Sequence, residues 1–527
     1  MVQTKNDKTA GGINGDVRAH MHHDSAVKHV SGSAVYVDDI ATPSNTLLVL
    51  IGQSPHAHAK IRHMDLTTVA AAPGVVAVMC ADDIPGVNDC GPVVHDDPIF
   101  AIDEVCYVGQ SVFAVAAVDM ASAHAAIQLA KIDYEPLPSL LTIDAAMQEK
   151  SLLGPPRQMT KGTPDQGLAG APNHLSGRLN SGGQEHFYLE GQAALAIPGE
   201  DGDMLLHCST QHPSEIQHKV AEMLGVANHA VTVETRRMGG AFGGKESQGN
   251  LPALTAALAA RLTGRPAKTV YDRDDDFMLT GKRHDFRIDY QVGFNDDGRI
   301  LAVVFEQALR CGMSWDLSAA IAARAMCHAD NAYDIEHMRI TSYCCKTHTQ
   351  SNTAFRGFGG PQGMLGIERV IDEVAHHLGI DPLIVRQRNF YAEKTADRFG
   401  VTPYGQKIED SVLNALVDEL TESSDYFARR AQIKAFNAAN RYLKRGLALT
   451  PVKFGISFNT TFLNQAGSLI HVYNDGSVMV NHGGTEMGQG LYIKVAQIVA
   501  HEFQIDVENI KITATTTGKV PNSSATA

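Results

Sequence analysis

The chain has 527 residues, a length that exceeds one hydrophobic core and predicts several domains. Its 44 basic and 58 acidic residues give a formal net charge of −14, which argues against a general role in nucleic-acid binding. The sequence has no apolar run of about 18 residues and no hydrophobic signal region near its start, so we expect a cytoplasmic protein that does not enter the membrane.

The chain opens with a polar segment, residues 1–26, that contains His20, His22 and His23. These histidines suggest a metal site, but the polar and Gly-containing composition favours a loose tail. The following residues, 27–150, predict a small α/β domain. Its expected elements are strands at 47–51 and 111–117 and a helix at 121–130.

Residues 151–180 are rich in Gly, Pro, Asn and Ser, which predicts a linker. The second large region, residues 181–420, alternates expected strands and helices. One helix is expected to begin at His212 and to end at Gly225. Its apolar residues share one face and are Ile216, Val220, Met223 and Leu224.

Two hairpins are expected, each around an Asp-Gly turn. In the second region, strands at 287–294 and 299–305 flank Asp296-Asp-Gly298. In the third region, residues 421–527, strands at 469–473 and 477–480 flank Asn474-Asp-Gly476.

The most informative segment is 237–246, which contains four glycines, Phe242 and a Lys-Glu pair. It lies between an expected strand at 231–235 and an expected helix at 251–262. Glycines in such a position let backbone N–H groups approach an anionic or planar ligand closely. The segment also fits the phosphate-binding GxxxxGK pattern, but Glu246 stands where Ser or Thr should hold Mg²⁺, which disfavours a nucleotide site. A purely structural turn remains the alternative.

Two further glycine clusters occur at residues 352–363 and 483–490. The second precedes an expected helix whose apolar stripe contains Leu491, Val495, Ile498 and Val499. Three such loops, spread over the second and third regions, indicate one large cofactor that is held from several sides.

Together these segments resemble the molybdenum-binding subunit of xanthine dehydrogenases, in the xanthine oxidase family of molybdopterin hydroxylases. Further matching strings lie at 30–39, 182–190, 209–211 and 462–467. The resemblance is to a bacterial-type enzyme and implies a mixed α/β (α+β) multidomain fold. It implies a hammerhead domain over 27–150, a first molybdopterin-binding domain over 181–420, and the start of a second, incomplete one over 421–527.

The resemblance also implies how the cofactor is bound. Gln211 and Phe242 would lie beside the molybdenum, Phe242 through its backbone amide, with Arg356 near the cofactor. No side chain would ligate the metal directly, because the pterin supplies soft sulfur ligands and the protein supplies the surrounding hydrogen bonds. A helix N-terminus after the last glycine cluster would receive the cofactor's phosphate. The implied cofactor-binding residues are Gln211, Gly240, Phe242, Gly243, Arg356, Met487, Gly488, Gln489 and Gly490.

Glu246 and Arg324 match the two family positions that read a purine, and both are expected to act in catalysis. A guanidinium offers planar donors to a carbonyl oxygen and stabilises negative charge on the ring, and a carboxylate can share a proton with ring N–H groups. Phe358 and Phe458 match the two aromatic residues that sandwich the substrate. Asn459 stands where a threonine is common and is also expected at the substrate.

The eight cysteines form no CxxC pair and indicate neither a disulfide framework nor an iron–sulfur site. No dinucleotide-binding or flavin motif is visible. The resemblance therefore implies a hetero-oligomer, in which a partner subunit carries [2Fe–2S] clusters and FAD and passes electrons to NAD⁺.

The activity implied by the resemblance is hydroxylation of hypoxanthine and xanthine to urate. Family members continue beyond the position of residue 527, and that part holds the glutamate that acts as the base. No GxGE-type sequence replaces it, so we expect a truncated chain. Two alternatives stay open: a hydroxylase of aldehydes or other N-heterocycles, and a catalytically inactive scaffold.

Overall fold

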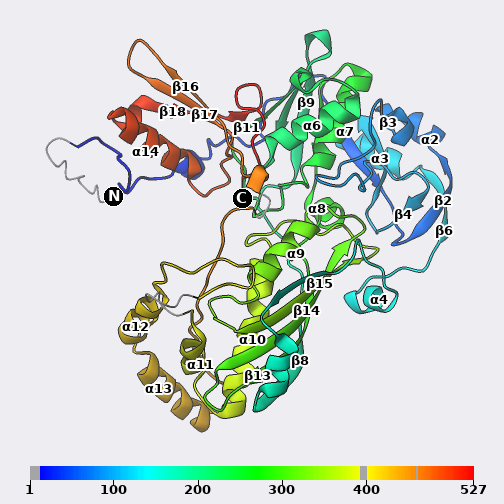
Figure 1. The fold of residues 1–527 in the computed structure, drawn as a ribbon. Helices are drawn as coiled ribbons and strands as arrows, with labels where there is room; N and C mark the ends of the chain where they lie inside the picture. Colours follow the sequence, from blue (N-terminus) through cyan, green and yellow to red (C-terminus); the bar gives the residue numbers. More distant parts are fainter. Residues whose placement is uncertain (1–11, 392–399, 459–460, 527) are drawn as a thin grey trace.

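A computed structural model describes residues 12–391, 400–458 and 461–526 of the chain. Two large sheets form the centre of the molecule, and a smaller sheet with one long helix stands beside them (Figure 1). Within the described ranges, no helix is long and apolar enough to span a membrane.

The larger sheet has eight strands and joins distant parts of the chain. Its strands, in order across the sheet, are β19 (Thr515–Thr516), β11 (Val231–Thr235), β10 (Met204–Cys208), β9 (Ala193–Pro198), β12 (Ala267–Val270), β1 (Leu47–Gln53), β5 (Ser111–Ala117) and β3 (Val75–Met79). The strands β1 and β12 pair in parallel. The main strands of the predicted 27–150 domain therefore extend a sheet that is built largely from later residues.

Strand β5 is buried along its whole length, which explains why its sequence is apolar without alternation. One face, with Ala114 and Ala116, belongs to the core formed with helix α7 (Asn250–Thr263). The other face, with Val115 and Ala117, packs in the core of helix α3 (Met120–Ile127). The strands predicted at 47–51, 111–117 and 231–235 and the helices predicted at 121–130 and 251–262 are confirmed, with small shifts at their ends.

The second sheet has five strands and carries helices α9 (Ser318–Cys327) and α10 (Gly360–Leu378) on one face. Its strands, in order, are β7 (Arg157–Lys161), β15 (His337–Lys346), β14 (Ile300–Gly312), β13 (Phe286–Phe294) and β8 (Asn173–Ser181). Strands β13 and β14 form the hairpin predicted around residues 296–298. Strands β7 and β8 arise from the predicted linker, so that prediction is wrong.

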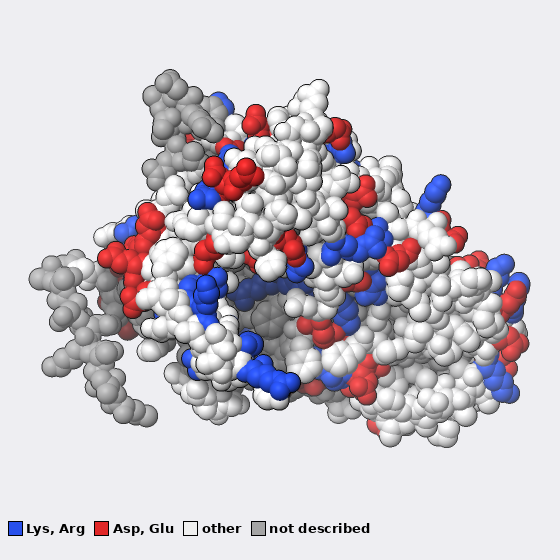
Figure 2. Space-filling view, turned by 90° about the horizontal axis from the view of Figure 1, so that it is seen from below, with Lys and Arg blue, Asp and Glu red and all other residues white. Residues whose placement is uncertain are grey.

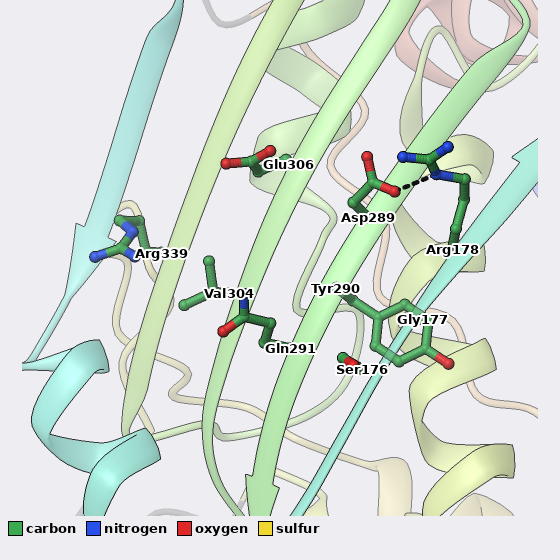
Figure 3. Close-up of a pocket in the computed structure, with 9 residues that line it drawn as sticks. All are labelled: Ser176, Gly177, Arg178, Asp289, Tyr290, Gln291, Val304, Glu306 and Arg339. Carbon is green, nitrogen blue, oxygen red and sulfur yellow. Dashed lines mark hydrogen bonds and ion pairs between the residues drawn. The ribbon is translucent and has the colours of Figure 1, made fainter. Parts of the chain in front are cut away.

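The composition of residues 151–180 has a physical reason other than flexibility. Strands β7 and β8 are the two edges of the sheet, and one face of the sheet is covered only in part, by α4 (Ile143–Gln148) and α5 (Pro164–Gly170). Figure 3 shows Arg178, Asp289, Glu306 and Arg339 on this face, around an open hollow of about 590 Å³. Arg178 forms an ion pair with Asp289. Polar residues at alternate positions of an edge strand are thus compatible with pairing.

The smaller sheet contains the second predicted hairpin. Its strands are β16 (Ser468–Val472), β17 (Val478–His482) and β18 (Ile510–Ile512), and it packs against α14 (Leu491–Phe503). Of the apolar stripe predicted on this helix, Val499 is buried but Ile498 is 54% exposed. The helix instead buries Ala496 and Ala500 beside Val507, because small side chains allow the N-terminal segment to pack closely there.

The described part of the predicted tail, residues 12–26, is not loose. The backbone carbonyl of Asn14 accepts a hydrogen bond from the N–H of Val507 at 3.0 Å. The side chain of Gln497 donates to the carbonyl of Asp16 at 2.9 Å. Figure 1 shows this dark-blue segment beside α14. Its polar residues form hydrogen bonds with the rest of the protein. A polar composition is also typical of a loose tail, so composition alone did not distinguish the two cases.

The boundary predicted between residues 420 and 421 falls within a helix. Helix α12 (Leu413–Ser423) and helix α13 (Tyr426–Ala439) contribute Val417 and Tyr426 to the core of the five-stranded sheet. The other helices are α1 (Ala26–Ser31), α2 (Thr67–Ala70), α4 (Ile143–Gln148), α5 (Pro164–Gly170), α6 (Pro213–Leu224), α8 (Arg273–Leu279) and α11 (Pro382–Asn389). The remaining strands form a sheet in the order β4 (Glu104–Val105), β2 (Ala59–Asp65) and β6 (Lys131–Pro136). Helix α6 ends before Gly225 and buries its four predicted apolar residues, as expected.

The core of the five-stranded sheet predicts a clear stability effect. Ile288→Ala removes a fully buried side chain from β13 and should cost roughly 2–5 kcal/mol. The thermal transition, followed by circular dichroism, should move down by several degrees. Val412→Ala, at a side chain that is 64% exposed, serves as the control and should leave the transition nearly unchanged. Equal melting temperatures for the two variants would contradict the assignment of this core.

Candidate active site

A cleft of about 850 Å³ lies where the three glycine loops meet. It gathers most of the residues predicted to bind the cofactor or the substrate. Those that line it are Gln211, Gly240, Phe242, Gly243, Glu246, Arg356, Phe358, Met487, Gly488 and Gln489. Three predicted residues, Arg324, Phe458 and Gly490, are not part of its lining, and Asn459 lies outside the described residues.

Sequence reasoning missed part of the lining. Phe187 and Leu189 border the cleft although they are 68% and 93% exposed, and Phe355 joins them from the second glycine cluster. Large apolar side chains left in solvent are the signal that marks such positions, but their exposure becomes visible only in the fold.

Gln211 anchors the first glycine loop to the cleft wall. Its side-chain oxygen accepts hydrogen bonds from the N–H groups of Gly243 at 3.0 Å and Lys245 at 3.3 Å. Its amide nitrogen donates to the carbonyl of Thr526 at 2.7 Å. Because the side chain is almost fully buried, each of these bonds satisfies a group that would otherwise be costly to bury.

The first glycine loop has a backbone that glycine favours. Gly240 and Gly243 have φ angles of 91° and 99°, and a Cβ atom on Gly243 would lie 2.8 Å from the carbonyl carbon of Ala354. Phe242 also has a positive φ, and its side chain is 42% exposed. Its carbonyl accepts the N–H of Arg356 at 2.8 Å, which joins the first loop to the second.

Lys245 does not serve a phosphate. Its side chain is fully buried, and its ammonium donates to Ser209 at 2.8 Å and to Glu190 at 3.1 Å. Burial lowers the pKa of Lys245 below its ordinary value, although the charge of Glu190 opposes this. The buried hydrogen bonds of Lys245 stabilise the loop from inside, which argues against the nucleotide-binding alternative.

Glu246 is a buried carboxylic acid at the cleft. Its side chain is 5% exposed, and burial raises its pKa from 4.5 to about 8, against the opposing charges of His212 and Arg324. At neutral pH the group therefore carries a proton. A neutral carboxyl can both donate and accept a hydrogen bond, which is the property that a proton-sharing contact with a ligand requires.

Arg324 is buried on helix α9 and lies behind the cleft lining. Its guanidinium donates to the backbone carbonyls of Gly455 and Ser457. It also lies over the rings of Phe358 at 5.7 Å and Phe454 at 5.4 Å. The charge is thus close to a cleft residue, Phe358, while its two terminal nitrogens, Nη1 and Nη2, each donate one hydrogen bond to the backbone.

The predicted aromatic pair meets, but not as a parallel sandwich. The rings of Phe358 and Phe458 have centroids 5.5 Å apart and an interplanar angle of 79°. This edge-to-face geometry is favourable for two aromatic rings in direct contact. The two residues are brought together as predicted, and they are in contact with each other rather than spaced by a ring.

The N-terminus of α14 is already occupied by a carboxylate. Glu486 accepts hydrogen bonds from the N–H groups of Gly488 at 2.8 Å, Gly490 at 3.1 Å and Tyr492 at 3.1 Å. These are the donors that the sequence assigned to a cofactor phosphate, so that part of the expectation is not supported. Burial raises the pKa of Glu486, but the backbone bonds and His23 outweigh it and hold the pKa below its ordinary value.

The residues of the cleft fit an extended anionic cofactor such as the predicted molybdopterin. Gly488 has a φ of 103°, and no atom lies within 4 Å of the place that a Cβ would take, so the loop leaves open space beside its backbone. Arg283 lies behind the lining residue Phe355, 3.9 Å from its ring centre, and donates one nitrogen to the carbonyl of Arg356, whereas its Nε and Nη1 are buried without a partner among the described residues. Burial lowers the pKa of Arg283 to about 10, which leaves it charged at neutral pH.

The charge around the molecule is uneven. On the face seen in Figure 2 the surface is hollowed near its centre, and Lys and Arg side chains gather around the hollow. The chain as a whole has a net charge of −14, so this clustering is local. A hollow with a positive rim attracts anionic ligands.

Comparisons with known proteins agree with this geometry. Models of three domain families match: the a/b hammerhead domain of aldehyde oxidase and xanthine dehydrogenase at residues 31–138, and the molybdopterin cofactor-binding domain at 147–390 and again at 419–527. The predicted fold class, a hammerhead domain followed by two molybdopterin-binding domains, is confirmed. The match over 147–390 also places the predicted linker within a domain.

Known sequences are similar over nearly the whole chain. The xanthine dehydrogenase/oxidase of Mus musculus is 45% identical over 96% of this chain, and the xanthine dehydrogenase of Oryza sativa is 43% identical over 96%. The chain spans only 38% and 37% of the lengths of these two relatives. It is thus a homologue of their molybdopterin-binding region.

Solved structures share the fold. Quinoline 2-oxidoreductase from Pseudomonas putida has a TM-score of 0.85 at 22% identity, over 98% of this chain and 68% of that one. Aldehyde oxidoreductase from Desulfovibrio gigas has a TM-score of 0.82 at 24% identity, over 98% of this chain and 58% of that one. At these identities the likeness concerns the fold alone.

The buried acid predicts a pH-dependent stability difference. Between pH 4.5 and about 8 the folded chain keeps a proton on Glu246 that the unfolded chain releases, so the free energy of unfolding falls as the pH rises. Glu246→Gln removes this proton. The variant should gain stability over the wild type progressively through this window, and the difference should level off above about pH 8. Thermal melting at a series of pH values measures it, and a constant difference would contradict the raised pKa.

The ion pair of Lys245 with Glu190 predicts that substitutions at the two residues have non-additive effects on the free energy of unfolding. Lys245→Met leaves Glu190 without its cationic partner and should destabilise the chain by about 3–5 kcal/mol, the usual cost of breaking a buried pair. The double variant Lys245→Met with Glu190→Gln should recover part of this loss, because no uncompensated charge remains. Urea unfolding of the four variants in a double-mutant cycle gives the coupling. Purely additive effects would show that the pair does not act as a unit.

Proposed function

Because this chain is a homologue of the molybdopterin-binding region of xanthine dehydrogenases, we propose that it holds the molybdenum cofactor and the substrate of a purine hydroxylase of that kind. The observation that carries the proposal is the cleft in which three glycine loops meet beside a protonated Glu246. The substrates proposed are hypoxanthine and xanthine, and the product is urate.

The chain's own residues would hold the cofactor from several sides. The loops at Gly240–Gly243 and Met487–Gln489 offer backbone groups, while Gln211 sets the position of the first loop. Arg356 and Arg283 offer positive charge. When bound, the cofactor supplies a redox-active metal that accepts two electrons from the substrate.

Glu246 and Arg324 would read the purine. The neutral carboxyl of Glu246 can donate its proton to a ring nitrogen or carbonyl oxygen and can accept from a ring N–H. Arg324 would stabilise negative charge on the ring, either from its present place behind Phe358 or after its bonds to the 455–457 backbone are released. The apolar residues Phe187 and Leu189 at the border of the cleft would help to exclude water.

Electrons would leave through another domain or subunit. None of the eight cysteines, all of which lie within the described residues, forms a disulfide, and the sequence provides no cluster-binding spacing. We therefore propose a hetero-oligomeric or larger enzyme in which a partner carries the [2Fe–2S] clusters and FAD, with NAD⁺ as acceptor. The base glutamate implied by the family resemblance has no counterpart among these residues, so residues other than these would supply it.

Two alternatives remain within reach of the same site. Aldehydes or other N-heterocycles could be the substrates, since proteins of the same fold are named for quinoline and aldehyde oxidation. The presence of Glu246 and Arg324 favours a purine, because neither group is needed to bind a simple aldehyde. A scaffold that binds cofactor or partner without catalysis is the second alternative.

The purine proposal predicts a selective loss. In the complete enzyme, loaded with cofactor, Glu246→Ala should lower kcat/KM for xanthine by roughly 100-fold, because a proton-sharing hydrogen bond to the ring is lost. Turnover of a small aromatic aldehyde should change less than about threefold, since an aldehyde lacks ring N–H groups.

The controls separate the alternatives. Molybdenum content, measured by elemental analysis, must be equal in the variant and the wild type for the kinetic comparison to apply. Equal losses for xanthine and aldehyde would refute the substrate assignment. A wild-type protein that contains molybdenum but turns over neither substrate would favour the scaffold.

A further inference from the structure

The N-terminal segment is attached to the helix that follows the third glycine loop. Asn14 and Asp16 bond to α14 and its surroundings, and Ile13 and Met21 pack into the apolar cluster around Ala496. The segment then continues toward the cleft wall. It brings residues from the very start of the chain next to residues more than 460 positions later.

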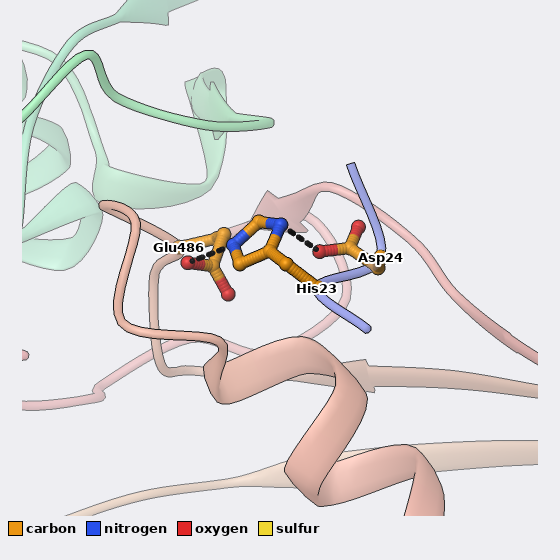
Figure 4. A group of neighbouring side chains, drawn as sticks. All are labelled: His23, Asp24 and Glu486. Carbon is orange, nitrogen blue, oxygen red and sulfur yellow. Dashed lines mark hydrogen bonds and ion pairs between the residues drawn. The ribbon is translucent and has the colours of Figure 1, made fainter. Parts of the chain in front are cut away.

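At the end of this segment His23 meets Glu486, as Figure 4 shows. The Nε2 atom of His23 lies 3.1 Å from a carboxylate oxygen of Glu486. That same oxygen accepts the N–H groups of Gly488 and Gly490, while the second oxygen accepts the N–H of Tyr492. His23 thus contacts a carboxylate that joins the cleft loop to the start of α14.

The tautomer of His23 follows from its neighbours. The N–H of Ser25 points to Nδ1 at 3.0 Å, and a backbone N–H can only donate. Nδ1 therefore accepts from Ser25, and a hydrogen on Nε2 is donated to Glu486; Nδ1 also lies 3.3 Å from a carboxylate oxygen of Asp24. Both ring nitrogens are engaged in this arrangement. The His23, Asp24 and Glu486 group, which has the composition of a metal site, then lacks a free imidazole lone pair for an ion.

A second contact holds the segment in the same place. Asp24 pairs with Arg236 at 3.3 Å, just after strand β11, and the guanidinium of Arg236 lies 5.0 Å from the ring centre of Tyr492. The N-terminal segment therefore contacts two elements next to the cleft. One is the end of β11, which precedes the first glycine loop, and the other is α14, which follows the third.

We propose that His23 is a positioning residue that orients Glu486 and, through it, the Met487–Gly490 loop at the cofactor cleft. The loop gains a fixed shape because the carboxylate that accepts its N–H groups is itself held by a donor from outside the loop. The effect on cofactor retention rests on the proposed function, whereas the effect on the loop does not. The N-terminal segment is then part of the active-site architecture.

Hydrogen exchange on the cofactor-free chain tests the loop directly. The matched variants are His23→Gln, whose amide nitrogen can take the place of Nε2, and His23→Asn, whose shorter amide mimics Nδ1. In His23→Asn the amides in peptides covering residues 486–492 should exchange at least about tenfold faster, because the donor to Glu486 is lost. In His23→Gln the rates should stay within about threefold of the wild type. Peptides from strand β13 serve as the internal control.

Every outcome bears on the proposal. Unchanged exchange in His23→Asn, or equal acceleration in both variants, would overturn it. If neither variant folds, nitrogen NMR of histidine-labelled wild type decides instead, since a neutral His23 ring whose only N-bound hydrogen is on Nδ1 contradicts the proposed bond. Molybdenum retained after purification of the loaded protein should fall in His23→Asn only. A wild type that never binds molybdenum, with the exchange pattern as expected, would refute the proposed function and leave the positioning role standing.

Discussion

Buried side-chain oxygens that accept hydrogen bonds from glycine-loop N–H groups hold the wall of the cleft. Gln211 accepts from Gly243, Glu190 accepts from Gly239 at 2.7 Å, and Glu486 accepts from Gly488. A glycine-rich loop has high conformational freedom and would not keep one shape without such partners. Because Gln211 and Glu486 are buried and the side chain of Glu190 is only 11% exposed, loss of any one leaves unsatisfied groups in a place that water reaches poorly. The loops are therefore both open enough for a large ligand and fixed in position.

The electrostatics of the site follow from the same burial. Glu486 stays ionised because several backbone donors surround it, whereas Glu246 has a raised pKa because burial dominates over the charges near it. Glu246 at the cleft and Glu486 behind its third loop thus take opposite protonation states. Lys245 and Arg324 are cations that bind groups of the chain itself. Lys245 pairs with the carboxylate of Glu190, and Arg324 donates to backbone carbonyls. Among the residues that line the cleft, Arg356 carries the positive charge that faces a ligand.

The topology explains how remote segments reach one cleft. The eight-stranded sheet takes strands from the hammerhead region, from the first molybdopterin-binding domain and from β19 near residue 515. The parallel contact of β1 with β12 and the antiparallel contact of β11 with β19 place the ends of several segments along one layer. The N-terminal segment packs against α14 and then reaches the end of β11, where Asp24 forms an ion pair with Arg236. Each domain therefore depends on its neighbours for part of its packing.

Local patterns in the sequence determined a large part of this protein: the Asp-Gly hairpins, the helix that Gly225 ends, the strand–glycine–helix order around Phe242, and the three glycine clusters that meet at the cleft. These follow from rules that act over a few residues, from backbone freedom at glycine and from apolar periodicity, and the family resemblance added the chemistry. Only the tertiary structure decided that residues 157–181 pair as sheet edges, that Glu486 occupies the N-terminus of α14, that His23 reaches it, and that Glu246 holds a proton. Each of these depends on contacts between residues far apart in the chain or on how completely a group is buried from water. Neither can be predicted from a few neighbouring residues.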